Sequence, residues 1–197
     1  MSTRRRLTPE QRRDQLLDVG EQLFRTRTFE ETSMDDVAEA AGVTRALLYH
    51  YFSTKAEFFG AIWGRAHTRL QLFAPAPTLR DSLREALAKY LDFYAENLPL
   101  VVIANRSSIS HDPAVRTPIR QNFEAIRAVI LDAARCAGPE RAIAETAFTG
   151  WIAFVKETTV ASLLDRQISH AENLDLCLAA LDGTVGAHAD LSRAPDH

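Results

Sequence analysis

Residues 44–55 bring together the side-chain types that proteins use to hold or read nucleic acid. An arginine, two tyrosines and a histidine lie within seven positions, where a helix surface would more often carry Glu and Lys: Arg45, Tyr49, His50 and Tyr51. A guanidinium can pair with a base edge or a phosphate, and hydroxyl and ring N–H groups can donate to either. Lys55 stands at the expected start of another helix, where a cation is unfavourable unless an anion such as a phosphate lies nearby. These residue types indicate DNA binding as the candidate chemistry.

A helix–turn–helix pattern over residues 32–55 must position these side chains. A hydroxyl at Thr32 or Ser33 can cap the first helix, and two acids favour its first turn. Gly42 ends that helix, since glycine adopts a left-handed backbone at little cost, and Thr44 can cap the second helix. Val43 is expected to fill the corner, and Leu48 and Phe52, four residues apart, share one helix face and point into the core. The polar and aromatic set is left on the outer side.

The same pattern has another interpretation, because a helix–turn–helix with a glycine corner also builds small bundles that bind no nucleic acid. The N-terminal residues 2–13 add weight to DNA binding, since they hold five arginines against the single acid Glu10: Arg4, Arg5, Arg6, Arg12 and Arg13. Such an arm could reach a phosphate backbone or a minor groove. A solubilising N-terminal tail is equally compatible with this composition.

Bulk composition limits the alternatives without choosing among them. The 197 residues are enough for one domain or two small ones, and the net charge of −3 requires that any attraction to DNA come from the placement of charge. Cys136 and Cys177 are too few for a disulfide framework, and no segment resembles a signal peptide or a membrane span. We expect a cytoplasmic protein without membrane contact.

Residues 9–59 resemble the DNA-binding domain of the TetR family of bacterial transcriptional regulators. The resemblance is carried by Thr32-Ser33-Met34, Val37-Ala38, Ala41-Gly42-Val43-Thr44-Arg45, Leu48-Tyr49-His50-Tyr51-Phe52 and Lys55. It implies a helix–turn–helix DNA-binding domain with a basic arm over residues 1–55. It also implies a helical ligand-binding and dimerisation domain over residues 56–197.

The resemblance also assigns roles to individual residues. It implies that the side chains facing bases or phosphates are those of Thr44, Arg45, Tyr49, His50 and Tyr51. Ser33 would meet the DNA backbone, and Lys55 a phosphate. Position 47 departs from the family, which often has Thr, Ser or Asn where this chain has Leu47. Leu47 could contact a thymine methyl group or pack internally.

Periodicity and breakers predict an all-α fold of about nine helices. Thr8 and Pro9 favour the start of a first helix, and two helices follow in the helix–turn–helix. The remaining helices are expected over 56–73, from Thr78 to before Pro99, and over about 100–108, 114–136, 140–166 and 169–188. No segment has the alternation of a strand.

The predicted C-terminal helices hold the mixture of apolar walls and few polar groups that is typical of small-molecule cavities. The candidate ligand-binding residues are Tyr90, Phe93, Tyr94, Asn105, Phe123, Trp151, Phe154 and Glu157. Glu157 could pair with a cationic or hydrogen-bonding ligand. Aromatic residues in helices also serve as ordinary core, so the pocket is expected mainly because the family resemblance implies one.

The last two helices are candidates for a dimer interface, since their apolar residues spread wider than one buried face requires. The residues concerned are Ala147, Gly150, Trp151, Phe154, Val155, Thr158 and Ala161, with Leu174, Leu178 and Leu181 on the final helix. Core packing explains many of them. The resemblance implies that both helices pack against their copies in a homodimer, which suits a near-palindromic double-stranded operator.

Motifs for catalysis, metal binding or a cofactor were not found in the sequence, and we predict no enzyme, metal or cofactor. The predicted function is that of a sequence-specific transcriptional regulator. We expect a repressor that a small hydrophobic or amphipathic effector releases from DNA, and the alternative mode of action is activation of transcription. The alternatives are a helical protein-interaction adaptor and, less favoured, an enzyme with a spatially assembled site. We expect Tyr49→Ala or Lys55→Ala to weaken operator binding and to leave the fold intact.

Overall fold

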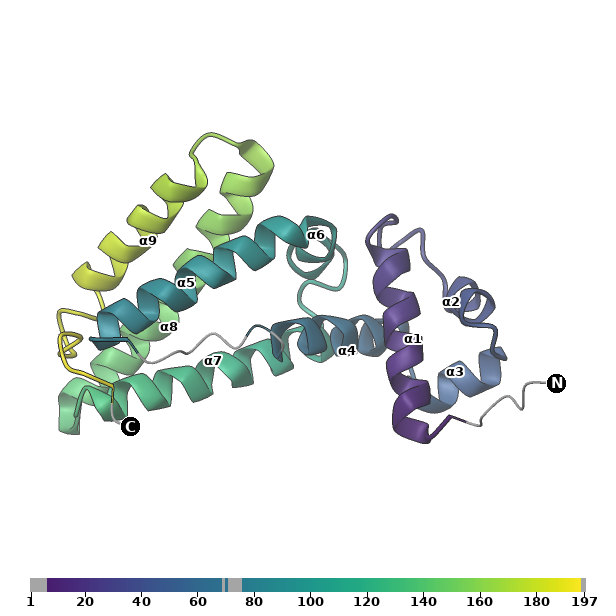
Figure 1. The fold of residues 1–197 in the computed structure, drawn as a ribbon, viewed down its shortest axis with the longest axis horizontal. Helices are drawn as coiled ribbons and strands as arrows, with labels where there is room; N and C mark the ends of the chain where they lie inside the picture. Colours follow the sequence, from purple (N-terminus) through teal and green to yellow (C-terminus); the bar gives the residue numbers. More distant parts are fainter. Residues whose placement is uncertain (1–6, 69, 71–75, 196–197) are drawn as a thin grey trace. The chain divides into compact units, whose positions relative to one another are not determined.

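The computed structural model describes residues 7–68, 70 and 76–195 (Figure 1). These residues form nine helices and no strand, which confirms the all-α prediction. The helices are α1 (Pro9–Phe24), α2 (Met34–Ala41), α3 (Arg45–Tyr51), α4 (Lys55–Thr68), α5 (Leu79–Glu96), α6 (Leu98–Arg106), α7 (Pro113–Ala133), α8 (Gly138–Asp165) and α9 (His170–Gly183). Within the described ranges, no helix combines the length and apolar character needed to cross a bilayer.

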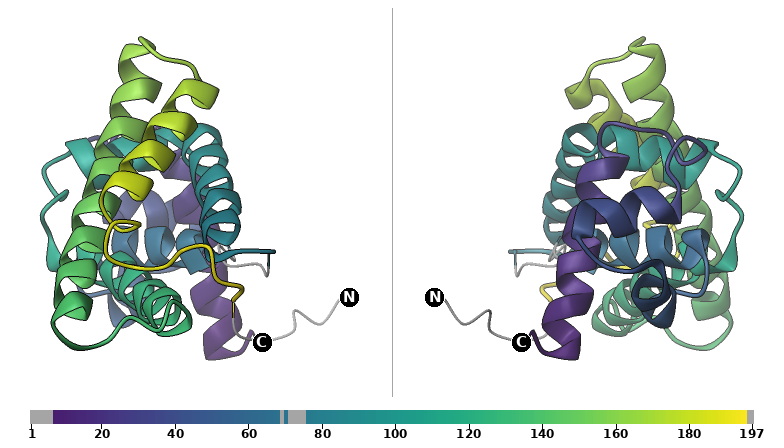
Figure 2. Two further views of the ribbon diagram at one scale, coloured as in Figure 1. Left: turned by 90° about the vertical axis from the view of Figure 1, so that its left-hand side faces the viewer. Right: turned by 90° about the vertical axis from the view of Figure 1, so that its right-hand side faces the viewer.

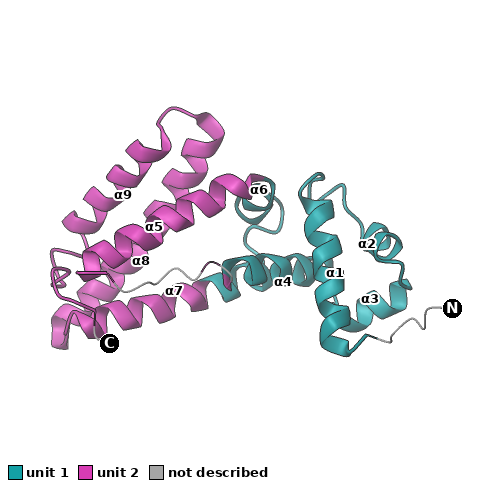
Figure 3. Cartoon of the chain, viewed as in Figure 1, with its two compact units in different colours: residues 1–67, 99–119 teal, residues 68–98, 120–197 magenta. Residues whose placement is uncertain are grey.

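The chain divides into two compact units, coloured separately in Figure 3. The first spans Met1–His67 and Pro99–Ile119, and the second spans Thr68–Leu98 and Arg120–His197. Helix α7 contributes its first turns to one unit and the rest of its length to the other. The structural division therefore groups α4 and most of α6 with α1–α3. The boundary at residue 55 concerns function and stays a prediction.

The expected helix boundaries in the first unit follow from local capping. Thr8 forms a capping box with Gln11, and Thr44 accepts a hydrogen bond from the backbone of Leu47 at 3.2 Å. Gly42 has φ 63°, the left-handed conformation that glycine tolerates best. The expected continuation of α4 to residue 73 falls partly on residues 69 and 71–75, which lie outside the described residues, as do Arg4, Arg5 and Arg6.

Aromatic rings form the core of the first unit. The ring centroids of Phe24 and Phe59 are 5.2 Å apart in an edge-on arrangement, and those of Phe52 and Phe58 are 4.9 Å apart. All four side chains are essentially inaccessible to solvent. This core fixes α1 and α4 together and supports α3 from beneath, through the buried Leu48.

Within the first unit, one contact joins α4 to the start of α7, and another joins the loop before α7 to the loop before α2. A Cβ on Gly60 would lie 2.3 Å from the backbone oxygen of Ala114, so no larger residue fits there without movement of α7. Pro118, inside α7, has no N–H to donate back to the Ala114 carbonyl. In addition, the Ser108 hydroxyl donates to Glu30 at 2.8 Å and holds the loop before α7 against the loop before α2.

The second unit is built on α5, α8, α9 and the later part of α7. Helices α8 and α9 run side by side as a hairpin (Figure 2), pinned where the Trp151 indole N–H donates to the Cys177 carbonyl at 2.8 Å. The C-terminal segment closes the start of α5, because the N–H of Leu79 donates to the Arg193 carbonyl at 2.8 Å. An Arg80–Asp182 ion pair of 2.7 Å joins the start of α5 to the end of α9.

Candidate functional site

The exposed face of α3 carries the strongest candidate for nucleic-acid binding. Leu48 turns inward and is fully buried, whereas Arg45, Tyr49 and His50 face solvent. Tyr49 is 37% exposed, an unusual degree for a large aromatic side chain on an otherwise well-packed unit. The helical period and the Thr44 cap therefore place the chemistry-bearing residues outward.

The Arg45 side chain is held in position by two neighbours. Its Nη1 lies 3.0 Å from a carboxylate oxygen of Asp35, and its guanidinium lies 5.3 Å from the centre of the Tyr49 ring. Such a cation–π contact is favourable and leaves other guanidinium N–H groups free to donate outward. The residue that could read a base edge is thus already ordered beside the aromatic residue that follows it one turn later.

Tyr51 and Leu47 occupy intermediate positions. Both are half-buried, and the Tyr51 ring packs edge-on against His50 at 5.5 Å. Because Leu47 is only half-buried, contact with a thymine methyl group and internal packing both remain predictions for this residue. Arg13, the last arginine of the N-terminal arm, lies over the Phe52 ring at 5.3 Å.

Ser33 has a structural task at the start of α2. Its hydroxyl donates to Asp36 at 2.6 Å and accepts from the Asp36 backbone N–H at 3.1 Å. The Ser33 backbone N–H also donates to the Asp36 carboxylate, at 2.8 Å, and the two hydrogen bonds that the hydroxyl and the N–H of Ser33 donate to this carboxylate lower its pKa. A contact between Ser33 and a DNA phosphate remains a prediction, and it would require the Ser33 hydroxyl or N–H to exchange its Asp36 partner for the phosphate.

Lys55 is placed differently from the sequence-based expectation. Its ammonium donates to the Phe29 carbonyl at 2.7 Å and the Thr32 carbonyl at 2.9 Å, and it lies 4.0 Å from the centre of the Phe29 ring. Desolvation lowers the Lys55 pKa, and the nearby Glu30 charge opposes that shift. The cation at the α4 start is therefore satisfied inside the protein, and we withdraw the expectation that its removal leaves the fold intact.

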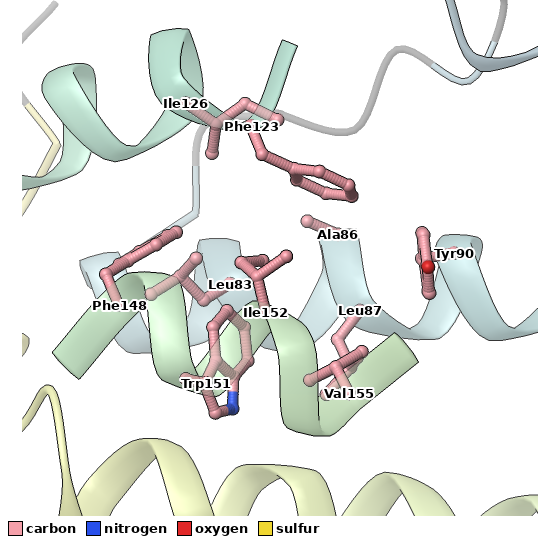
Figure 4. Close-up of a pocket in the computed structure, with 10 residues that line it drawn as sticks. All are labelled: Leu83, Ala86, Leu87, Tyr90, Phe123, Ile126, Phe148, Trp151, Ile152 and Val155. Carbon is pink, nitrogen blue, oxygen red and sulfur yellow. The ribbon is translucent and has the colours of Figure 1, made fainter. Parts of the chain in front are cut away.

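A cavity of ≈ 30 Å³ lies in the second unit, between α5, α7 and α8 (Figure 4). Phe123 and Ile126 of α7 face the remaining lining residues across it. The lining consists of Leu83, Ala86, Leu87, Tyr90, Phe123, Ile126, Phe148, Trp151, Ile152 and Val155. Four of these residues repeat at helical spacing along α8, a pattern in the sequence that could have identified its inner face: Phe148, Trp151, Ile152 and Val155.

Three of the eight predicted ligand residues line this cavity: Tyr90, Phe123 and Trp151. Tyr94 is buried with its ring 4.2 Å from that of Tyr90, although it is not part of the lining. Phe93 is half-buried outside the lining.

The other three predicted ligand residues lie elsewhere. Asn105 belongs to the first unit, where its amide donates to the Val101 carbonyl at 2.8 Å. Phe154 and Glu157 are exposed, because each lies more than a quarter-turn around α8 from Phe148, Ile152 and Val155 of its inner face. Sequence reasoning therefore misjudged the rotation of α8.

The outer face of α8 and α9 carries several exposed large hydrophobic residues beside the exposed Glu157. They are Ile143, Phe154 and Leu164 on α8, Ile168 in the turn between the helices and Leu176 on α9. A Cβ on Gly150, between the first two, would meet nothing within 4 Å. Of the predicted dimer residues, Gly150 and Phe154 belong to this face, whereas four are buried inside the protomer: Trp151, Val155, Leu178 and Leu181.

Comparison with known proteins relates both units to one family. Residues 16–62 match the model of "Bacterial regulatory proteins, tetR family". The crystal structure of a tetR-family transcriptional regulator from Streptomyces coelicolor is 28% identical, with a TM-score of 0.73. That similarity covers 94% of this chain and 86% of the other.

Two curated relatives are similar over shorter regions. The HTH-type transcriptional activator FasR of Mycolicibacterium smegmatis is 27% identical over 132 residues, which cover 64% of this chain and 60% of FasR. The HTH-type transcriptional regulator AcrR of Shigella flexneri is 35% identical over 63 residues, which cover 32% of this chain and 29% of AcrR. The matched regions thus span less than two thirds of either relative. With the helix–turn–helix geometry and the nine-helix fold of the described residues, these similarities lead to one conclusion: the chain belongs to the TetR family of bacterial transcriptional regulators.

Proposed function

We propose that this protein is a sequence-specific DNA-binding transcriptional regulator whose hold on its operator depends on a small molecule. The observation that carries the proposal is the outer face of α3, where Arg45 is held over Tyr49 with its remaining N–H groups directed to solvent. Ligand-responsive repression is typical of TetR-family regulators, which favours a repressor as the mode of action.

In the proposed complex, α3 lies in the major groove and its exposed face meets the bases. Arg45 would pair with a guanine edge or a phosphate, since a guanidinium can donate two parallel hydrogen bonds. The proposed contact set is Ser33, Thr44, Arg45, Leu47, Tyr49, His50 and Tyr51. Lys55 joins it only through the third N–H of an ammonium already bound to two carbonyls.

A second copy of the chain is the proposed partner of the apolar α8–α9 face. A single helix–turn–helix offers few contacts to DNA, whereas a two-fold dimer can present two α3 helices to half-sites about 34 Å apart. Burial of Phe154 and Leu164, exposed by 36% and 45% in the single chain, would supply hydrophobic stabilisation for that dimer. The operator is accordingly expected to be near-palindromic.

The cavity is the proposed effector site, and α7 is the element that can report its occupancy. Phe123 and Ile126 of α7 line the cavity, while Ala114, earlier on the same helix, is in close contact with Gly60 of α4. An effector shifts DNA binding only by its difference in affinity for the two states, commonly about 1–3 kcal/mol. Regulation in the cytoplasm by binding, without catalysis of its own, completes the proposal.

Recovery of genomic fragments by the purified full chain is the direct test. A near-palindromic sequence should be enriched, and its affinity should fall steeply with salt because phosphate contacts release counterions. Recovery of no preferred sequence would refute the proposal.

A matched pair of arginine variants then tests the site. Arg45 and Arg120 each form one exposed ion pair, with Asp35 at 3.0 Å and Glu124 at 3.3 Å. Arg45→Ala should weaken operator binding by about 5- to 150-fold, the range for loss of a base contact of about 1–3 kcal/mol. Arg120→Ala should leave gel-shift affinity unchanged, and equal effects of both variants would remove α3 from the assignment.

A further inference from the structure

The cavity in the second unit is almost wholly hydrocarbon. Only two of its ten lining side chains contain a polar atom, namely Tyr90 and Trp151. The Trp151 indole N–H is already bound to the Cys177 carbonyl at 2.8 Å. The Tyr90 hydroxyl is hydrogen-bonded to the side chain of Tyr94, so both polar groups of the lining already have partners within the protein.

That hydroxyl remains neutral. Burial raises the pKa of Tyr90 well above its usual value, and the neighbouring Tyr94, whose ring is 4.2 Å away, adds to the shift. A neutral phenol that is already hydrogen-bonded within the protein cannot balance the formal charge of a guest.

Charged residues of the surrounding helices are committed elsewhere. Arg127 of α7 donates to Thr149 at 2.8 Å, and Arg141 of α8 pairs with Glu145 at 3.0 Å and with Asp132 at 2.6 Å. Glu157 of α8 is exposed. Within the described residues, the lining thus holds no ion to pair with a carboxylate or an ammonium group, and an unpaired ion in such a site pays a large desolvation cost.

The walls also indicate where a guest enters. Seven lining residues are buried, whereas Phe123, Ile126 and Ile152 are half-exposed. These three lie on α7 and the adjoining face of α8, so access lies between those helices (Figure 4). The ≈ 30 Å³ of free space is far below the several hundred Å³ of a drug-sized site, so a guest must be narrow and must displace Phe123 or Ile126.

We propose that this cavity selects an uncharged, narrow, apolar molecule, such as an alkyl chain or a single ring with at most one polar group. Acids and amines of the same skeleton are rejected. The proposal builds on the effector site proposed above, but binding itself requires no DNA.

A matched eight-carbon series tests this selectivity by calorimetry on the full chain at pH 7: 1-octanol, octanoate and octylamine. Octanol should bind at least about tenfold more tightly than either ion, because each ion would lose its hydration without gaining a partner. Equal or tighter binding of octanoate or octylamine would overturn the proposal, and so would the absence of octanol binding.

Substitution at the entrance tests the location. Ile126→Lys places a cation at the half-exposed rim and should reverse the preference toward octanoate, whereas Ile126→Met should retain the preference for octanol. Circular dichroism and thermal unfolding verify that both variants fold. If Ile126→Lys does not fold, Ile152→Lys provides the same test from α8, and an unchanged preference in a folded lysine variant would overturn the assignment.

Operator release is measured separately, so that the two proposals can fail independently. Octanol binding without any change in gel-shift affinity would retain the ligand class and refute the effector role. Operator binding that is normal in a chain without octanol binding would retain the DNA-binding proposal and refute the ligand class.

Discussion

The outer faces of α3 and α8 expose opposite kinds of side chain to solvent. Each helix buries one side, yet α3 presents Arg45 and Tyr49 outward whereas α8 presents Phe154 and Leu164. The α3 face is stable in water, since its charge is paired with Asp35 and its ring is covered by a guanidinium. The α8 face leaves hydrocarbon in water. The first arrangement suits exchange with a charged polymer, and the second suits permanent burial against protein.

Spacing strengthens this distinction. Single exposed hydrophobic residues are ordinary on protein surfaces. On α8, however, Ile143, Gly150, Phe154 and Leu164 recur at positions that share one side of the helix, as residues of a helix–helix seam do. The comparison therefore predicts that charge introduced on the outer face of α8 damages assembly, whereas loss of the exposed Arg45 or Asp35 charge at α3 changes only DNA recognition.

The largest effect is expected from Phe154→Glu combined with Leu164→Glu. Two carboxylates in an apolar interface should cost several kcal/mol and convert the dimer to monomer, with loss of tight binding to a two-half-site operator. Sedimentation equilibrium and gel shift measure both outcomes. The control is Ala125→Glu with Ala128→Glu on the exposed side of α7. A double variant that remains dimeric would remove α8 from the interface.

Acid should affect the unit that carries α3 through His67. Burial lowers the pKa of this imidazole from 6.5 to about 4, and a hydrogen bond with the Trp63 carbonyl only partly opposes the shift. The unfolded chain therefore binds a proton between pH 6.5 and 4 that the folded chain does not. The free energy of unfolding should therefore be highest above pH 6.5 and should be about 2 kcal/mol lower at pH 5.

Urea titrations at pH 7 and pH 5 measure this loss. His67→Phe should flatten the pH dependence, whereas replacement of the exposed His188 should not. An identical slope in His67→Phe and the parent would refute the role of this imidazole.

Loss of Lys55 should reduce stability before it reduces recognition. Lys55→Met leaves the Phe29 and Thr32 carbonyls without their donor, and each such loss costs about 1–3 kcal/mol. Thermal unfolding should show the decrease, while the exposed Lys89→Met should show none. If Lys55→Met keeps its melting temperature and loses operator affinity, Lys55 belongs with the DNA-contact residues instead.

Replacement by alanine should change the stability of the protein in opposite directions at two helical glycines, Gly60 of α4 and Gly150 of α8. Gly60→Ala forces a Cβ to 2.3 Å from the Ala114 oxygen and should destabilise the protein by about 1–3 kcal/mol. Gly150→Ala meets nothing within 4 Å and should stabilise α8 by roughly 0.5–1 kcal/mol. Denaturant unfolding measures both. A destabilised Gly150→Ala dimer would show that the partner's backbone approaches this position closely.

The smallest effect is expected at Asp35. An exposed ion pair contributes only about 0.2–1 kcal/mol, so Asp35→Asn should change operator affinity by a few-fold. Release of Arg45 should also raise affinity for unrelated DNA and thus lower specificity. Glu39→Gln removes the same charge from α2 and serves as the control. In an Arg45→Ala background, Asp35→Asn should have no further effect on specificity; a persistent effect would mean that Asp35 acts independently of Arg45.

Most of the helix–turn–helix could be predicted from the sequence, because the residues that determine its helix boundaries act locally. The hydroxyl cap at Ser33, the acidic first turn and Gly42 at φ 63° each act on backbone groups within three or four residues of themselves. The cavity residues were harder to predict, since α8 is apolar on most of its circumference. Phe154 and Trp151 look alike in sequence, yet one is exposed and the other buried.

The amino-acid sequence by itself determined the helices, the corner at Gly42 and the outward set Arg45, Tyr49 and His50, because helical period and capping are short-range. Tertiary structure alone decided the rotation of α8, since only packing against α5 and α9 distinguishes its inner apolar side from its outer one. It also decided the partners of Lys55, which lie 23 and 26 residues earlier in the chain. A pattern read along the chain orients a side chain on its helix, whereas only the folded neighbours decide what that side chain meets.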